Sequence, residues 1–419
     1  MMKKFLSIIC CLHIVVICFA QIVPPGREEK NLDYFVSQAL ASSPLLKDYQ
    51  SQLLLLSLDS QIIRASLRPL VKGISNNSYA PVIGGWGYDE VITNGQQVSA
   101  MIGLSKTLLS RKSIASQIES LGIQSQSANN VIKVSEQDLK KLIADQYILA
   151  YGGQLQLDFS RHINDLLEKE DSLLKKLTRD NIFKQSEYLA FAVLLQQQLL
   201  NTSQLEVQYD LDYATLNYMA GIVDTFTVRL QDPQLSSGGY TDFSKSVFYR
   251  QFVLDSLKLA NDRALVDLKY RPNINLFADG GYNSSLVYKA YKNFGTSVGI
   301  NVAIPIYDGQ QRKLQYSKVD IQERTRVKKR DFFVQQHDQQ LLQLERQLRS
   351  TNKLIDQINK QIAYTETLIT VNERLLATGD IRLVDFILAL SNYFNAKNLL
   401  TQNYISRLKI INQLNYWVR

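Results

Sequence analysis

The ionisable residues of this 419-residue chain form no catalytic or metal-binding pattern. Catalytic and phosphate-binding motifs need particular residue types at fixed spacing. The sequence contains neither a Gly-x-Ser-x-Gly turn nor a Gly-rich phosphate loop, and no His, Cys and Asp cluster has metal-ligand spacing. His162 and His337 are far apart, and we interpret both as solvated or packed side chains. The chain is therefore predicted not to be an enzyme and to need no cofactor.

Instead, several residues and short segments recur 198 positions further along the chain. Four pairs share this offset: residues 105–111 with 303–309, Asn181 with Gly379, Glu187 with Asp385, and Leu216-Asn217-Tyr218 with Leu414-Asn415-Tyr416. Asn and Gly both accept the left-handed conformation in which helices commonly end. A single offset at four separate places indicates an internal duplication.

Each repeat contains the same predicted elements. In the first repeat (31–239) we expect a helix over 31–67, strands near 70–82 and 96–109, helices over 111–179 and 181–220, and a linker over 221–239. In the second (240–419) we expect a helix over 240–270, strands near 273–284 and 294–307, and helices over 310–378 and 380–419. Arg68-Pro69 and Arg271-Pro272 end the first helices, because the residue before a proline disfavours helix.

A strand with one apolar face precedes the longest helix. Val298, Ile300 and Val302 alternate with small or polar residues, which is the pattern of a half-apolar strand. Pro305 lacks an N–H and weakens the ladder, and Gly309 allows a turn. We therefore expect strand over 294–306 and helix from about 311, and a continuous helix across Pro305 would contradict this interpretation.

The long helix has a seven-residue apolar repeat. Its members are Val327, Val334, Leu341, Leu348, Ile355, Ile362, Ile369 and Leu376. Eight such positions favour left-handed coiled-coil packing. The column three residues further along is mixed and includes His337, Thr351 and Asn372. Both a solvated coiled-coil exterior and a water-filled interior fit this pattern.

The composition narrows the cellular setting. Residues 1–20 have the positive start, apolar stretch and small-x-small end of a signal peptide, and 21–30 read as an exposed leader. The alternatives for 1–20, a membrane anchor and a lipoprotein signal, fit less well because the apolar stretch is short and Ile17 precedes Cys18. All three cysteines lie in this segment. The formal net charge is +8, and the basic residues are interleaved with acidic ones. This pattern does not indicate nucleic-acid binding.

No later segment has about 18 uninterrupted apolar residues, the length of a membrane helix. Entry into a membrane would therefore require β-strands that close into a barrel. Four strands per chain are too few to close one, which calls for oligomers.

The repeated strand–strand–long helix–turn–helix order resembles the TolC-like outer-membrane efflux family. The resemblance covers about residues 30–417. Its most specific motifs are Pro305-Ile306-Tyr307-x-Gly309, Arg271-Pro272, residues 377–385 (Ala-Thr-Gly-Asp-Ile-Arg-Leu-Val-Asp), Tyr393-Phe394-Asn395-Ala396-Lys397, and Asn412-Gln413-Leu414-Asn415.

The resemblance implies a membrane α+β fold. Three chains with four strands each would form a 12-stranded β-barrel in the outer membrane, continued by a periplasmic α-helical coiled-coil barrel. The function implied is the exit duct of a tripartite efflux or type I secretion system, with a periplasmic adaptor and an inner-membrane pump as partners. Pro305, Tyr307 and Gly309 would mark one strand-to-helix junction, and Thr107 and Arg111 the other.

The resemblance also implies a periplasmic tip at the turns of Asn181 and Gly379. Candidates for the aperture are Asp385, Arg382, Glu187 and Asp380. Asp385 matches an aspartate of an acidic ring, but Leu388 replaces the second aspartate expected one turn later. A solvated helix face is the alternative for each charge. The alternative for the whole chain is a periplasm-spanning coiled-coil scaffold or adhesin, and the sequence does not identify a cargo.

Overall fold

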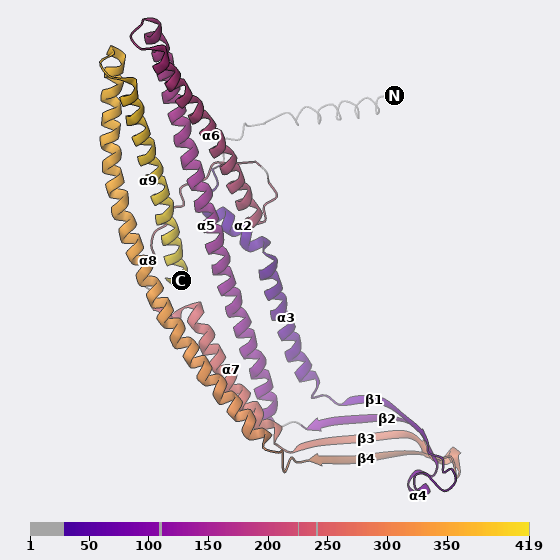
Figure 1. Cartoon of the computed structure of the whole chain (residues 1–419). Coiled ribbons are helices and arrows are strands. Elements are labelled where there is room, and N and C mark those ends of the chain that lie inside the picture. The colour runs from indigo at the N-terminus through magenta and orange to yellow at the C-terminus, as the bar shows by residue number, and fades with distance from the viewer. Residues whose placement is uncertain (1–28, 109–110, 225, 240–241, 419) are drawn as a thin grey trace, which may run out of the picture. The chain divides into compact units, whose positions relative to one another are not determined.

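The computed structural model describes residues 29–108, 111–224, 226–239 and 242–418 (Figure 1). The predicted signal peptide and most of the leader lie outside these ranges. Two compact units are present. Unit 1 includes the described residues up to Ser43 together with 136–239 and 339–418, and unit 2 includes 44–135 and 242–338. Each unit therefore combines segments from both sequence repeats.

Unit 2 contains one antiparallel sheet of four strands in sequence order (Figure 1). The strands are β1 (Leu70–Tyr79), β2 (Gln96–Leu108), β3 (Asn273–Ser284) and β4 (Phe294–Ala303). A short helix α4 (Glu90–Thr93) lies in the β1–β2 connection, and the 3-10 helix η3 (Ala290–Lys292) lies between β3 and β4. The second hairpin is thus joined to the first through the β2–β3 pairing, which links the two repeats.

The helices of unit 2 are α3 (Pro44–Ala65), η2 (Phe243–Lys245), α7 (Val247–Lys269), and the first parts of α5 (Arg111–Arg179) and α8 (Gln311–Thr378). Asn130 Nδ2 donates to the Val247 carbonyl at 2.9 Å, which joins α5 to α7. Arg263 pairs with Asp320 at 2.9 Å and joins α7 to α8. His337 is buried and stacks on Phe243, whereas His162 is exposed.

Unit 1 consists of α2 (Leu32–Ser42), α6 (Gln185–Ala220), α9 (Leu383–Val418) and the remaining parts of α5 and α8. One apolar cluster lies where α2, α5, α6 and α9 meet, around Phe35, Tyr147 and Tyr213. A second cluster joins α5, α6, α8 and α9 near the two helix turns. Gly152 is required in the first cluster, because a Cβ there would lie 2.1 Å from the Ile405 side chain of α9.

The fold confirms four strands per chain combined with long paired helices. Several predicted boundaries were wrong. The helix expected over 31–67 is divided into α2 and α3, because Pro44 opens a second helix. The helices expected to begin at 181 and 380 begin at Gln185 and Leu383, since the turns are longer than the left-handed residue alone.

The last strand also ends earlier than residue 306. β4 ends at Ala303, whose partner in the register is Asn273. Pro272 directly precedes β3 and Pro305 comes two residues after β4 ends, so each segment lacks a backbone N–H donor close to the end of the ladder. Similarly, β1 ends at Tyr79 rather than near 82, shortly before Pro81. Among the described residues, no helix is long and apolar enough to cross a lipid bilayer.

Candidate functional sites: a two-faced sheet and two matched turns

The register of the sheet collects apolar side chains on one face. Directly paired residues of an antiparallel sheet point to the same side. The pairs Val71 with Leu104, Leu104 with Ala278, and Ala278 with Val298 therefore define one face across all four strands. We call it the apolar face, and its apolar members are Val71, Val98, Ala100, Ile102, Leu104, Leu108, Ile274, Leu276, Ala278, Tyr282, Phe294, Val298, Ile300 and Val302.

Nine of these fourteen apolar residues are exposed, and the other five, Val98, Ile274, Leu276, Ala278 and Tyr282, are half-buried. Ile102 and Ile300 are each 67% exposed and Val298 is 83% exposed. A contiguous exposed apolar surface of this kind marks contact with another apolar phase or a partner. At the end of the sheet away from the helices, the centroids of the Tyr282 and Phe294 rings lie 5.3 Å apart.

The opposite face, the polar face, carries amides, hydroxyls and single charges. Its polar members are Lys72, Asn76, Ser78, Gln97, Ser99, Ser105, Thr107, Asn273, Asn275, Asp279, Asn283, Ser297 and Asn301. They bond across strands: Ser297 Oγ donates to Asp279 at 2.8 Å, and Gln97 Nε2 donates to Asn283 at 3.2 Å. Leu70, Ile74, Met101 and Phe277 also lie on this face, so the register separates a mainly apolar side from a more polar one.

The predicted junction residues lie at the end of the sheet near the helices, and the two junctions differ. In the first repeat Thr107 is still in β2, and α5 begins at Arg111. In the second repeat Pro305, Tyr307 and Gly309 all lie in the connection between β4 and α8. The helix-to-strand breaks Pro69 and Pro272 directly precede β1 and β3.

At the second junction, the side chain of Asp308 caps the start of α8. Asp308 accepts hydrogen bonds from the backbone N–H groups of Gln310 at 2.9 Å and Arg312 at 2.7 Å, which satisfies donors in the first turn of α8. Gly309 has φ +62° and Gln310 has φ +69°, so the chain reverses through two left-handed residues. A side chain with a Cβ is disfavoured in this region, which explains the glycine.

The two predicted tip turns have the same hydrogen-bond pattern. Asn181 has φ +58° and Gly379 has φ +79°. In the first turn the N–H groups of Asn181 and Ile182 donate to the carbonyls of Thr178 and Leu177. In the second, the corresponding N–H groups of Gly379 and Asp380 donate to Leu376 and Leu375, again 198 positions on. Both are Schellman motifs, which end α5 and α8 identically.

The two turns also touch. A Cβ on Gly379 would lie 2.8 Å from Ile182 Cγ2. Beneath the turns, Leu177, Phe183, Leu376, Leu383 and Phe386 belong to one buried cluster shared by the four helices. The turns are therefore held as one end of unit 1.

The candidate aperture residues are brought together in part. Arg382 donates to both carboxylate oxygens of Asp385, at 2.9 and 3.1 Å, within one turn at the start of α9. This hydrogen bonding raises the pKa of Arg382. At the equivalent place in α6, Glu187 accepts from the backbone N–H of Lys184 at 3.0 Å and so caps the helix. Asp380 accepts from the Thr378 hydroxyl at 2.6 Å in the turn itself.

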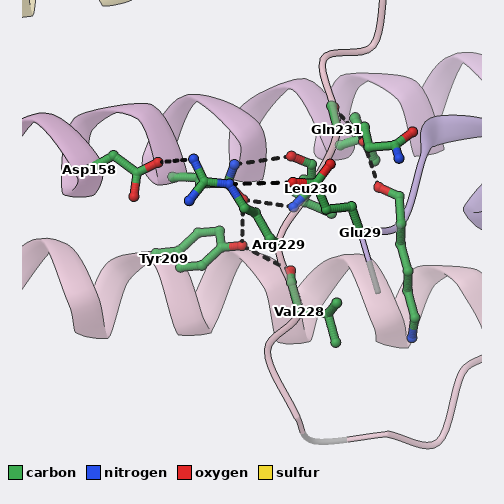
Figure 2. Close-up of polar contacts among 10 residues, drawn as sticks. Glu29, Asp158, Tyr209, Val228, Arg229, Leu230 and Gln231 are labelled. Carbon is green, nitrogen blue, oxygen red and sulfur yellow. Dashed lines mark hydrogen bonds and ion pairs between the residues drawn. The ribbon is translucent and has the colours of Figure 1, made fainter. Parts of the chain in front are cut away.

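Sequence reasoning missed one structured region, because it treated residues 221–239 only as a linker. Residues 226–239, which we call the strap, lie along α5 and α6 (Figure 2). Arg229 donates to Asp158 of α5 at 2.7 Å, and Tyr209 of α6 donates to the Val228 carbonyl at 3.1 Å. The strap also forms a parallel bridge to Lys30 through hydrogen bonds of 3.0 and 3.1 Å.

Gln154 of α5 holds the centre of the strap. Its Oε1 accepts from the Leu230 N–H at 2.7 Å, and its Nε2 donates to the Leu230 carbonyl at 3.0 Å. Tyr209 also donates to Gln154 Oε1, at 3.0 Å. Burial raises the pKa of Tyr209, so its hydroxyl stays protonated. The only feature of the sequence that indicated contacts to this segment was the repeated asparagine. Asn217 donates to the Asp224 carbonyl, just before the strap. Its counterpart Asn415 donates to the Ser236 carbonyl and accepts from the Gly238 N–H.

Comparison with solved structures finds this fold over nearly the whole chain. The transmembrane channel CusC matches with a TM-score of 0.72 at 12% identity, covering 93% of this chain and 92% of that one. The outer membrane protein VceC from Vibrio cholerae matches with a TM-score of 0.73 at 10% identity, covering 92% and 95%. The MtrE outer membrane channel of Neisseria gonorrhoeae matches with a TM-score of 0.72 at 12% identity, covering 92% and 88%.

These likenesses establish a shared fold. A scan against protein-family profiles and a search of curated proteins found no match to the sequence.

Proposed function

We propose that this chain is an outer-membrane channel, the passive exit duct of a tripartite efflux or secretion system. The observation that carries the proposal is the register of the sheet, which places an exposed apolar face back to back with a polar one. Such strands suit a wall with lipid on one side and water on the other. The strands have 10 to 13 residues, which is long enough to cross a bilayer when tilted.

The sheet also supports a trimer. β1 and β4 are its edges, and each pairs with a single neighbour within the described chain. Unpaired backbone donors and acceptors are very costly in lipid, so the edges require partners of the same kind. Three copies joined β4 to β1 give a closed barrel of 12 strands, like the channels that share this fold.

The helices suit the periplasmic part of the duct. α8 has 68 residues, enough at 1.5 Å per residue for about 100 Å of helix. The turns at Asn181 and Gly379 would then form the tip that meets a periplasmic adaptor and, through it, an inner-membrane pump. In the mixed column of α8, His337 and Asn372 are buried, so this column packs against other side chains and does not line a water-filled space.

Fractionation and conductance test the proposal. The full-length protein is expected to remain with the outer membrane after a high-salt wash, to migrate as a heat-sensitive trimer, and to conduct ions in a planar bilayer. A protein that conducts no current, or that the salt wash releases, would contradict it. A released, non-conducting coiled-coil oligomer would instead support the scaffold or adhesin function.

Arg382 and Asp385 are proposed to form part of the closed aperture. Replacing Arg382 by Ala removes a bidentate ion pair that orders the first turn of α9. We expect Arg382→Ala trimers to show higher resting conductance than wild type in planar bilayers. Lys184→Ala is the matched control, since Lys184 is the equivalent residue of the first repeat and its backbone N–H retains the Glu187 cap. If Arg382→Ala trimers had the same resting conductance as wild type, the ion pair would have no part in closing the aperture.

A further inference from the structure

One carboxyl group occupies a core position between the helices of unit 1. On α5, Glu170 follows Ile163 by seven residues and precedes Leu177 by seven, with Leu167 and Leu174 at the intervening core positions. These four apolar residues are all buried in the cluster beneath the two turns. Glu170 is itself only 4% exposed. It therefore stands where a coiled coil normally places an apolar side chain.

The surroundings of Glu170 disfavour a negative charge. Its Oε2 atom is buried and has no hydrogen-bond partner among the described residues. Burial, and next the charge of Glu373 on α8, raise the pKa of Glu170, while Lys169 of the same helix opposes the shift. α6 carries no ionisable side chain from 189 to 205, and α9 carries none from 386 to 392. The other two helices of the cluster thus offer no cation over these stretches.

We propose that Glu170 is a proton-binding site that controls how firmly the four helices hold together beneath the turns. With a proton bound, the side chain is neutral and the cluster packs around it. Without the proton, a carboxylate lies in an apolar core near Glu373, and the contact between α5 and α8 loosens. This inference concerns the helix cluster alone and does not depend on conduction.

The direction of the pH effect follows from linkage. A carboxyl whose pKa is higher in the packed state than in the open one binds its proton more tightly when packed. Its contribution to packing is therefore fully present at low pH and is lost as the pH rises through the raised pKa. Mild acid should tighten the turn-bearing end of unit 1, and alkaline pH should loosen it.

Hydrogen–deuterium exchange of the full-length protein tests the site. At pH 8, amides of residues 163–177 in Glu170→Gln are expected to exchange several-fold more slowly than in wild type, because glutamine is a neutral replacement of the same shape. The difference between the two proteins should shrink as the pH is lowered, because wild-type Glu170 then binds its proton. Glu168→Gln removes an exposed carboxylate from the same helix and should follow wild type at every pH.

A second variant tests whether the amide of glutamine is itself unfavourable in this apolar core. Glu170→Leu restores an apolar core residue and is also expected to slow exchange at pH 8. The proposal is overturned if Glu170→Gln exchanges at the wild-type rate at pH 8, or if both variants exchange faster than wild type. Exchange can be measured whether or not the protein conducts, so a failure here is distinct from a failure of the proposed channel function.

Discussion

At the scale of single residues, Gln154 is a polar side chain that the core of unit 1 buries together with its hydrogen-bond partners. It is buried and satisfies both backbone groups of Leu230, and it also accepts from Tyr209. Buried backbone groups without partners are costly. The side chain therefore fixes the path of the strap across α5 and α6, a role that the spacing of residues in the sequence did not indicate.

Replacement of Gln154 tests this role. Gln154→Leu keeps the volume but leaves the N–H and C=O of Leu230 unpaired, so we expect a loss of about 3 kcal/mol in unfolding free energy. Tyr209→Phe removes one hydroxyl and should cost about 1 kcal/mol. Urea unfolding followed by circular dichroism measures both. Equal losses in the two variants would show that Gln154 contributes no more to stability than the Tyr209 hydroxyl does.

At the scale of elements, the duplication is visible as equivalent hydrogen bonds. The turns after α5 and α8 share a Schellman motif, yet the first uses Asn181 and the second Gly379. At the second turn a Cβ would lie 2.8 Å from Ile182 Cγ2, which gives a steric reason for the glycine there. The repeats keep the same backbone and differ where their side chains meet.

The two turns should therefore respond differently to substitution. Gly379→Ala combines a positive φ with a Cβ 2.8 Å from Ile182, so we expect a loss of roughly 1–3 kcal/mol. Asn181→Gly relieves a left-handed residue and should change stability by less than about 1 kcal/mol. Thermal unfolding of both variants beside wild type provides the comparison. A Gly379→Ala protein as stable as wild type would show that the turn relaxes freely.

At the scale of the whole molecule, the proposed channel function depends on which side of the sheet meets lipid. Ile300 lies on the apolar face, and its neighbour Asn301 lies on the polar face. The two positions belong to the same strand and differ by one residue, so they share depth and backbone but not environment. They form a matched pair for the proposed barrel.

Charged residues at this pair should separate lipid from water. Ile300→Lys is expected to destabilise the membrane-inserted trimer by about 2–4 kcal/mol for a position near the bilayer centre. Asn301→Lys places its ammonium group in the aqueous interior and should leave assembly unchanged. The fraction of trimer that survives heating, resolved by gel electrophoresis, reports the difference. Equal trimer fractions in the two variants would contradict the assignment of faces.

Much of the fold was predictable because its signals are local. Alternation along β4, the apolar column of α8 and the Arg-Pro breaks each depend on a short stretch of chain. The repeat offset predicted that Asn181 and Gly379 occupy equivalent turns, and the structure shows the same hydrogen bonds in both. Exact ends were less predictable, since the end of β4 at Ala303 depends on the opposite residue, Pro272, as well as on Pro305.

Features that depend on contacts between residues far apart in the sequence were decided only by the tertiary structure. The sequence by itself established a duplicated chain of half-apolar strands and very long helices, because periodicity and spacing are properties of the chain. Only the register could place most of the apolar residues of four strands on one face, and only packing could turn a linker into a strap held by Gln154. The seven-residue spacing of α5 can place Glu170 at a core position, but its burial depends on the apolar side chains that α6, α8 and α9 add to the cluster.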